Sequence, residues 1–165
     1  MRTKGPGAGY SIREMTMADY PRVRRIWAGT PGICLVADDA RAGIAVYLRR
    51  NRGLCFVAAA GTGIVGTVLC GHDGRRAILR HLAVVPGHQG RGLGRALTQR
   101  CLRALTACGI PRCSVYVLDD NAAGMDFWRH LGFAELAYDY RTLQAPTRPG
   151  RRRPAAGRKA HGRPH

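Results

Sequence analysis

Apolar and polar positions change their spacing several times along the chain, and each change predicts a secondary-structure element. Residues 10–14 (YSIRE) alternate in polarity and predict a short strand. Thr16 is expected to cap the helix that follows, because apolar side chains then recur at helical spacing as far as Trp27. The acidic pair at 38–39 suits the positive N-terminus of a second helix, which is expected to end near residue 53.

The centre of the chain predicts antiparallel strands. Two apolar runs, 54–60 and 64–70, flank the turn Gly61-Thr62-Gly63 in the manner of a hairpin. A second glycine-containing turn at 71–74 leads into a third apolar run over 77–85. Three consecutive strands are therefore expected to form a meander.

The second half of the chain predicts two further helices and the strands around them. Residues 92–107 combine an apolar stripe with an arginine-rich face, which is typical of an amphipathic helix that packs on a core. Shorter segments follow, and we expect a strand over 113–118, a helix over 122–131 and a strand or hairpin over 133–143.

The length and composition of the chain fit one folded domain. Its 165 residues lie within the usual domain size of about 100–200 residues, and 45% hydrophobic residues exclude a fully disordered chain. No apolar run approaches the ~18 residues of a membrane span, and no apolar segment follows the basic N-terminus as in a signal peptide. The six cysteines stand singly within apolar segments, which predicts buried free thiols rather than disulfides or metal ligands. We therefore expect a cytoplasmic protein that does not bind membranes.

The positive charge is concentrated at the end of the chain. The sequence has 27 Lys and Arg against 10 Asp and Glu, and residues 148–165 contain seven of the basic residues and none of the acidic ones. We expect a flexible N-terminus over 1–9, one domain over 10–147 and a disordered basic tail over 148–165. We expect such a tail to be a solvated extension without a partner, and weak binding of RNA or another polyanion through its charge is the alternative. Because only two of the 27 basic residues are lysines, a genomic composition bias is an alternative origin for part of the charge, in place of selection for a polyanion.

The most informative segment runs over 82–96 (LAVVPGHQGRGLGRA), where a strand passes through a glycine-rich loop into the long helix. Glycine lets a ligand approach the backbone, and the free amides and the dipole of a helix N-terminus attract an anion. Arg91 and Arg95 add full positive charges, so the loop predicts a phosphate or pyrophosphate site, with an ordinary tight turn as the alternative. A P-loop would end in Gly-Lys-Ser/Thr, which is missing. The dinucleotide fingerprint fails because Arg95 stands where its third glycine would be.

Two motifs together resemble the GNAT N-acetyltransferase superfamily. The pattern Val-x-Pro-x-x-Gln-x-x-Gly-x-Gly at 84–94 resembles its acyl-CoA pyrophosphate loop, and residues 121–133 (NAAGMDFWRHLGF) resemble its late motif of an asparagine, a short helix, an aromatic pair and Leu-Gly-Phe. The resemblance covers about residues 10–143, and the segments 66–68 and 71–74 are most similar to the YpeA-type bacterial acetyltransferases. It implies the α/β (α+β) class and a GNAT fold, with a central mixed, mostly antiparallel sheet of about six or seven strands flanked by about four helices. The protein would be a monomer or a homodimer.

The resemblance also implies a site for acetyl-CoA as co-substrate. The strand edge at Leu82, Ala83 and Val84 would bind the pantetheine arm, and the Val84 amide would stabilise the oxyanion of the reacting thioester. Asn121 and Trp128 would line the far side of the arm. The pyrophosphate would be held by the loop residues Gln89, Gly90, Arg91, Gly92, Leu93, Gly94 and Arg95.

The implied reaction is the direct attack of a neutral primary amine, expected to be a small molecule, on acetyl-CoA in a ternary complex. The sequence departs from the family at both expected catalytic positions. Trp128 stands where a tyrosine often protonates the leaving thiolate, and Tyr116 stands where the ribosomal-protein N-terminal acetyltransferases have a glutamate. The candidates that could bind or deprotonate the amine are Tyr116, His81, Asp119 and Asp120, each of which could equally have a structural role.

Two other functions are compatible with the sequence. One is the acetylation of a protein or peptide N-terminus by an enzyme that docks through its basic tail. The other is a non-catalytic module that binds acyl-CoA or nucleic acid, as the departures at Tyr116 and Trp128 allow. In this fold the segment 30–37 between the first two helices is expected to select the acceptor, and its residues carry no charge that would indicate one.

Overall fold

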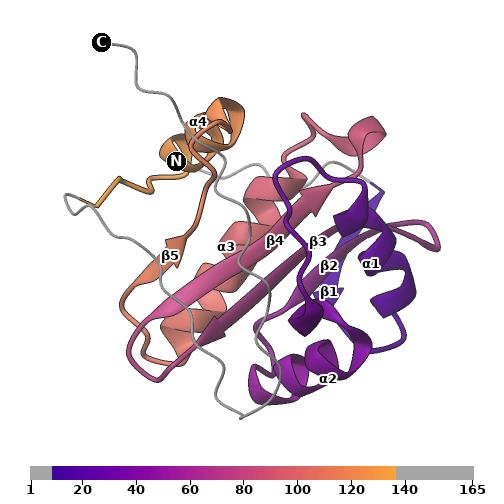
Figure 1. Cartoon of the computed structure of the whole chain (residues 1–165), viewed down its shortest axis with the longest axis horizontal. Coiled ribbons are helices and arrows are strands. Elements are labelled where there is room, and N and C mark those ends of the chain that lie inside the picture. The colour runs from indigo at the N-terminus through magenta and orange to yellow at the C-terminus, as the bar shows by residue number, and fades with distance from the viewer. Residues whose placement is uncertain (1–8, 137–165) are drawn as a thin grey trace, which may run out of the picture. The chain divides into compact units, whose positions relative to one another are not determined.

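The structure is a computed structural model, and it describes residues 9–136 (Figure 1). These residues belong to a compact unit that ends at Ala134, apart from Glu135 and Leu136, which belong to a second unit that continues to the C-terminus. In chain order the elements are β1 (Tyr10–Glu14), α1 (Tyr20–Ala28), the short 3-10 helix η1 (Ala37–Asp39), α2 (Arg41–Arg50), β2 (Phe56–Ala60), β3 (Gly63–His72), β4 (Ala77–Val84), the 3-10 helix η2 (Pro86–His88), α3 (Leu93–Ala107), β5 (Cys113–Val115) and α4 (Ala122–His130).

Within the described residues, five strands form one mixed sheet in the order β1-β2-β3-β4-β5. The first four strands pair antiparallel, and β5 lies parallel to β4. The predicted meander of β2, β3 and β4 and the α+β class are thereby confirmed. The expected sheet of six or seven strands is larger than the observed one, because residues 133–136 are not a strand. Residues 137–143 and the predicted tail at 148–165 lie outside the described residues.

The start of α1 differs from the prediction. Thr16 does not cap the helix, which begins at Tyr20 after a turn. The reason is Asp19, whose carboxylate accepts hydrogen bonds from the backbone N–H and the hydroxyl of Thr16 and pairs with both terminal nitrogens of Arg13 at 2.7 Å. The Arg13 guanidinium holds the pKa of the Asp19 carboxyl below its usual value. The acidic pair at 38–39 likewise precedes α2 instead of starting it.

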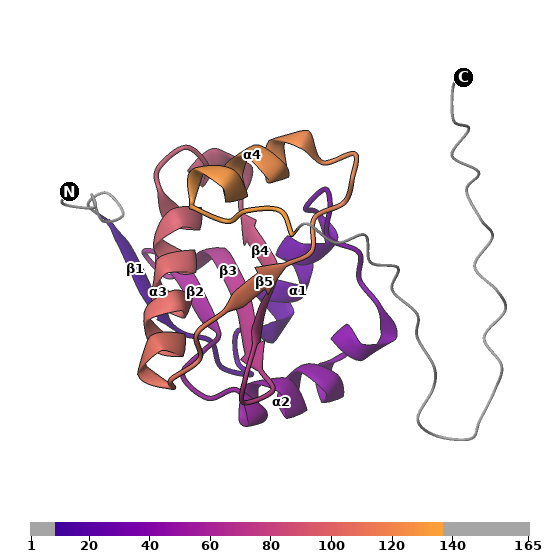
Figure 2. The same ribbon diagram turned by 90° about the vertical axis from the view of Figure 1, so that its left-hand side faces the viewer.

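Helices cover both faces of the sheet (Figure 2). On one face, Leu97 and Leu105 of α3 pack in a core with Val68 of β3. On the other face, Val23 and Trp27 of α1 belong to a second core. Each of these five side chains is at most 2% exposed. Because full burial of a large apolar side chain contributes about 1.5–3 kcal/mol, the two cores fix the sheet between its helices.

An irregularity of β4 shapes the functional region. Two successive pairs of β3 and β4 are Thr67–Ala83 and Leu69–Arg80, so β4 has one residue more than β3 between them. The extra residue creates a β-bulge at His81. The φ of His81 is +52°, the one positive value among the described non-glycine residues. The bulge therefore changes the direction of this side chain relative to a regular strand.

The bulge coincides with the point at which β4 and β5 separate. The two parallel strands pair only where residues 77–79 of β4 face 113–115 of β5. As a result β5 ends at Val115, whereas the sequence predicts a strand to residue 118. The chain after β5 then crosses to Asn121, at the start of α4, without hydrogen-bonding to β4 as a strand.

All six cysteines are free thiols. Cys55, Cys70 and Cys101 are buried, as predicted, and burial raises the pKa of the Cys55 thiol to about 12. The prediction of burial is wrong for Cys34 and Cys108, which are exposed. Both lie outside regular core elements, one in the loop ahead of η1 and the other just after α3, so an apolar sequence neighbourhood does not bury them.

Candidate functional site

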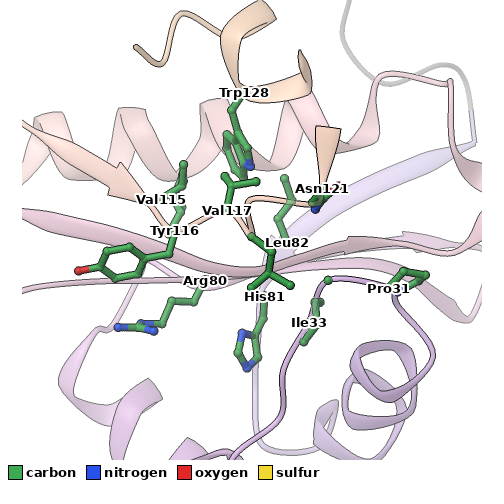
Figure 3. Close-up of a pocket in the computed structure, with 13 residues that line it drawn as sticks. Pro31, Ile33, Arg80, His81, Leu82, Val115, Tyr116, Val117, Asn121 and Trp128 are labelled. Atoms are coloured by element: carbon green, nitrogen blue, oxygen red, sulfur yellow. The ribbon is translucent and has the colours of Figure 1, made fainter. Parts of the chain in front are cut away.

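A pocket lies where β4 and β5 separate (Figure 3). It is lined by residues 31–33 from the loop after α1, by 79–82 of β4 and by 115–118 from β5 and the chain after it. Asn121 and Trp128 line its remaining side. The pocket thereby brings together five of the residues that the sequence singles out: His81, Leu82, Tyr116, Asn121 and Trp128.

The glycine-rich loop between β4 and α3 leaves the start of the helix open. Gly90 and Gly92 have φ values of +70° and +77°, and a Cβ on either would meet no atom within 4 Å. The first hydrogen bond of α3 runs from the Ala96 N–H to the Gly92 carbonyl at 2.9 Å, so the amides of 93–95 have no acceptor within the helix. The first turn, all of it described, contains no acidic side chain. We define the loop and these amides as the cradle, an arrangement that can bind an anion through the main chain.

Two side chains hold the cradle onto the sheet. Gln89 Nε2 donates a hydrogen bond of 2.9 Å to the carbonyl oxygen of Val84, at the end of β4. His88 Nδ1 lies 3.0 Å from the hydroxyl of Tyr10 in β1. The structure thus places the Gln89 side chain on the backbone of β4, where it fixes the course of the loop.

The last residues of β4 present a polar backbone edge. The Val85 N–H donates to the Val65 carbonyl at 2.9 Å, so the backbone groups of Val85 and Ala83 face β3. Since neighbouring residues of an antiparallel strand direct these groups to opposite sides, the N–H and C=O of Val84 face the side that β5 has left. The Val84 carbonyl accepts the hydrogen bond from Gln89 Nε2, which leaves the Val84 N–H directed away from β3 without a partner from that strand. We define this edge together with the pocket as the groove.

Helix α4 and its aromatic residues are fixed beside the groove. Asn121 Oδ1 caps the helix by accepting a hydrogen bond of 2.9 Å from a backbone N–H of its first turn. Trp128 packs edge-on against Phe127 and Phe133, with ring centroids 5.0 Å apart in both pairs. Phe127 also lies against α3, because a Cβ on Gly94 would meet its ring at 3.1 Å. These contacts couple the position of Trp128 to the start of α3.

His81 is held by the segment that precedes α2. Its Nε2 lies 2.9 Å from Asp39 Oδ1, and its ring packs edge-on against Trp27 with centroids 4.8 Å apart. Asp39 is fixed in turn, because its Oδ2 accepts from the Val36 N–H and its carbonyl accepts from the Tyr20 hydroxyl, both at 2.9 Å. The side chains of the pair are 13% and 10% exposed. When Nε2–H is donated to the carboxylate, Nδ1 keeps a lone pair that can take a proton.

Asp39 is a site residue that sequence reasoning missed, because the pattern around it indicated only a helix-start charge. Its contact with His81 spans 42 residues and depends on the bulge in β4. In Figure 3 the His81 ring points to the opposite side of β4 from Trp128. No local signal in the sequence marks either the bulge or the partner that it brings within reach.

The other candidates for handling the amine lie at the rim of the pocket or outside it. Tyr116 is 72% exposed, and the Arg80 guanidinium lies over its ring, 5.6 Å from the centroid. Figure 3 shows the Tyr116 hydroxyl pointing away from His81 and Trp128. The acidic pair at 119–120 is exposed in the turn before α4 and does not line the pocket.

Comparison with known families matches residues 11–133 to the acetyltransferase (GNAT) family. The chain belongs to the GNAT family. Similar solved structures include Ard1 from Thermoplasma volcanium, with 21% identity and a TM-score of 0.70 over 79% of this chain and 86% of that one. The PaiA N-acetyltransferase from Thermoplasma acidophilum, in complex with coenzyme A, has 18% identity and a TM-score of 0.69 over 79% and 92% of the two chains. Rv2747 from Mycobacterium tuberculosis, in complex with CoA and NLQ, has 19% identity and a TM-score of 0.63 over 76% and 72%.

In this GNAT-family chain, residues 9–136 contain no group of three or more His, Cys, Asp or Glu side chains placed to hold a metal ion. None of the helices in the same part of the chain is both long enough and apolar enough to cross a membrane. The candidate site consists of three parts: the cradle, the groove and the His81–Asp39 pair.

Proposed function

We propose that this GNAT-family chain transfers the acetyl group of acetyl-CoA to a primary amine by direct attack in a ternary complex. The observation that carries the proposal is the order of the site along one stretch of chain, because β4 runs from the pocket at His81 through Val84 into the loop and the open start of α3 at Gly92. A long co-substrate with a thioester at one end and phosphates at the other matches this path. Two of the similar solved structures are complexes with CoA, which supports the same assignment.

The pyrophosphate of acetyl-CoA would lie on the cradle. The amides of 93–95 have no acceptor within the helix, and the N-terminal end of α3 attracts negative charge. The exposed side chains of Arg91 and Arg95 flank these amides in the sequence and would add charge-assisted hydrogen bonds to phosphate oxygens. The open space around Gly92 would let the phosphates approach the main chain.

The pantetheine arm would follow the edge of β4, with the outward-facing N–H of Val84 as its hydrogen-bonding partner. The backbone groups of Ala83 face β3 and would not take part. The Val84 amide is directed away from β3 and would donate to the oxygen of the thioester as negative charge develops there. Asn121 and Trp128, which line the other side of the pocket, would cover the end of the arm. This placement puts the acetyl group beside the bulge.

We infer that His81 takes the proton of the attacking amine. The amine nitrogen bonds to the acetyl carbon, the carbon–sulfur bond breaks, and the proton passes to Nδ1 while Asp39 stabilises the imidazolium through Nε2–H. Tyr116 is less suited because its hydroxyl points away from His81 and Trp128, between which the acetyl group would lie. The Trp128 indole can donate a hydrogen bond but is no acid at neutral pH, so the thiolate would leave without a protein acid.

The acceptor is proposed to be a small molecule. Segment 30–37 approaches the groove closely, since a Cβ on Gly32 would lie 3.0 Å from Asn121 Nδ2. The loop therefore narrows the pocket between Gly32 and Asn121, which favours a small amine over an extended protein surface. Within the GNAT family, we propose that the chain is of the YpeA type, because segments 66–68 and 71–74 resemble those acetyltransferases.

The proposal is tested by following thiol release from acetyl-CoA with the full chain and a panel of small primary amines and unblocked peptides. We expect thiol release that depends on a small amine, and an N-acetylated product in the mass spectrum. Acetylation of peptides alone would replace the small acceptor with a protein N-terminus. Tight binding of acetyl-CoA without turnover of any acceptor would instead make the chain a non-catalytic acyl-CoA module.

A further inference from the structure

The charges at the acceptor end of the pocket are unbalanced. The titratable side chains that line the pocket are Arg80, His81 and Tyr116, and no carboxylate lines it. The nearby carboxylate of Asp39 already interacts with His81 through Oδ1 and accepts a hydrogen bond from the Val36 N–H through Oδ2. None of the ion pairs among residues 9–136 includes Arg80. The pocket therefore presents one full positive charge without an anionic partner.

Arg80 lies at the end of the groove where an acceptor would enter. Along β4 the order runs from Val84, next to the cradle, through the bulge at His81 to Arg80. If the phosphates occupy the cradle, the acetyl group reaches the bulge and the acceptor must lie beyond it. Arg80 immediately precedes the bulge on that side and lines the pocket. Its guanidinium extends with the Tyr116 ring away from His81, so it can contact a group of the acceptor that lies a few bonds from the reacting nitrogen.

The guanidinium is also oriented by an aromatic ring. Its central carbon lies 5.6 Å from the centroid of Tyr116, and Figure 3 shows the two side chains directed to the same side of the pocket. Stacking on a ring leaves the N–H groups at the guanidinium edge free, and these groups match the two oxygens of a planar carboxylate or those of a phosphate. A lysine-like point charge would lack this geometry.

We propose that the acceptor is a primary amine that carries a carboxylate or a phosphate a few bonds from its nitrogen, and that Arg80 binds this anionic group. The inference rests on the proposed function. A polycationic amine would meet an unpaired guanidinium and no carboxylate at the pocket, whereas an anionic group on the acceptor would supply the missing counter-charge. The positive charge of Arg80 also opposes protonation of an amine nearby, and only the neutral amine attacks the thioester.

The test compares matched acceptors in the thiol-release assay with the full chain. The pairs are alanine against alaninamide and phosphoethanolamine against ethanolamine, and spermidine serves as the cationic acceptor. We expect the anionic member of at least one pair to have a kcat/KM at least about tenfold higher than its uncharged partner. The pair that shows the preference tells whether the anion is a carboxylate or a phosphate.

The variant Arg80→Gln should abolish that preference by raising KM for the anionic acceptor while kcat changes little. Arg75→Gln is the matched control, since Arg75 is exposed in the turn before β4 and does not line the pocket. Equal or faster turnover of uncharged amines or spermidine overturns the inference, as does a preference that survives Arg80→Gln. Failure to acetylate any anionic amine by a chain that binds acetyl-CoA also overturns it, whereas failure to bind acetyl-CoA removes the proposed function itself.

Discussion

Replacing Asp39 by asparagine separates the chemistry proposed for His81 from the packing around it. The carboxylate of Asp39 accepts from Val36 N–H through Oδ2 and lies against His81 Nε2 through Oδ1, both at 2.9 Å. Asparagine has the same shape but only one acceptor oxygen. If that oxygen keeps the bond to Val36, the side-chain NH2 faces Nε2, and the imidazole must move its proton to Nδ1. The nitrogen that would take the amine proton is then blocked.

Asp39→Asn is expected to lower both the stability of the fold and the turnover number, and the size of each effect follows from the hydrogen bonds of Asp39 and the proposed role of His81. Each hydrogen bond to the carboxylate contributes about 1.5–3 kcal/mol, and the neutral bonds of asparagine recover about 1 kcal/mol each. We therefore expect Asp39→Asn to lower the free energy of unfolding by about 1–4 kcal/mol in total for the two bonds, which leaves a chain of ordinary stability folded. Loss of a general base lowers the turnover number by roughly 10²- to 10⁴-fold. The catalytic effect should thus far exceed what the loss of stability explains.

Three measurements distinguish the chemical effect from a structural one. The turnover number should fall while the affinity for acetyl-CoA stays within about twofold of the parent chain. The ¹⁵N chemical shifts of the His81 ring should show the proton on Nε2 in the parent and on Nδ1 in Asp39→Asn. Asp38→Asn is the control, because Asp38 is the exposed neighbour of Asp39 and should leave all three readouts unchanged.

A turnover number that is unchanged in Asp39→Asn would refute the assignment of His81 as the proton acceptor. A variant that loses acetyl-CoA binding together with activity would show that Asp39 acts by holding the fold. An unaltered tautomer of His81 would mean that the hydrogen bond at 2.9 Å does not control the position of the proton.

Two further predictions test the cores. Thr67→Val should stabilise the protein by about 1 kcal/mol and raise the melting temperature by roughly 2–4 °C. The reason is that the buried Thr67 hydroxyl has no hydrogen-bond partner, and valine has the same shape. A lower melting temperature would show that the hydroxyl does form a hydrogen bond. Alkylation of the native protein, read by mass spectrometry, should modify the exposed Cys34 and Cys108 first. Cys55, whose pKa burial raises to about 12, should react only in denaturant, and its rapid modification under native conditions would contradict the packing.

The elements that the sequence predicts well are those whose signal is local. The predictions of the strand at 10–14 and of the helix that ends at Ala107 agree with the structure. Both rest on patterns within the segment itself, namely the alternation of polar and apolar residues in the strand and the arginine-rich, solvent-facing side of the helix. The turns at 61–63 and 71–74 set the meander in the same way. The cradle could also be predicted, since its glycines and the helix that follows form one continuous segment.

The features that sequence reasoning missed depend on contacts between distant segments. The bulge at His81 adds a residue to β4 without changing its polarity pattern, so the pattern contains no sign of it. Asp39 reaches His81 only after α1 and η1 pack on the sheet. Thr16 failed as a helix cap because Arg13 on β1 and Asp19 form a network that no helix propensity describes. The acceptor end of the pocket is assembled by the fold, which is why sequence alone named no acceptor.

The most direct test of the account is the melting temperature of the full chain with and without acetyl-CoA, with ATP and NADH as control ligands. A ligand at 100 times its dissociation constant stabilises the native state by about 2.7 kcal/mol, which corresponds to a rise of roughly 5–11 °C for a chain of this size. We predict this rise with acetyl-CoA and much smaller ones with ATP and NADH. We also predict that Gly92→Glu, which puts a carboxylate into the cradle, loses this rise. Gly92→Ala is the control, because it has the same backbone strain at a φ of +77° without the added charge. Its folding would show that the chain tolerates a side chain at this position. No rise in the folded parent, an equal rise with all three ligands, or a full rise in Gly92→Glu would contradict the proposed acetyl-CoA site.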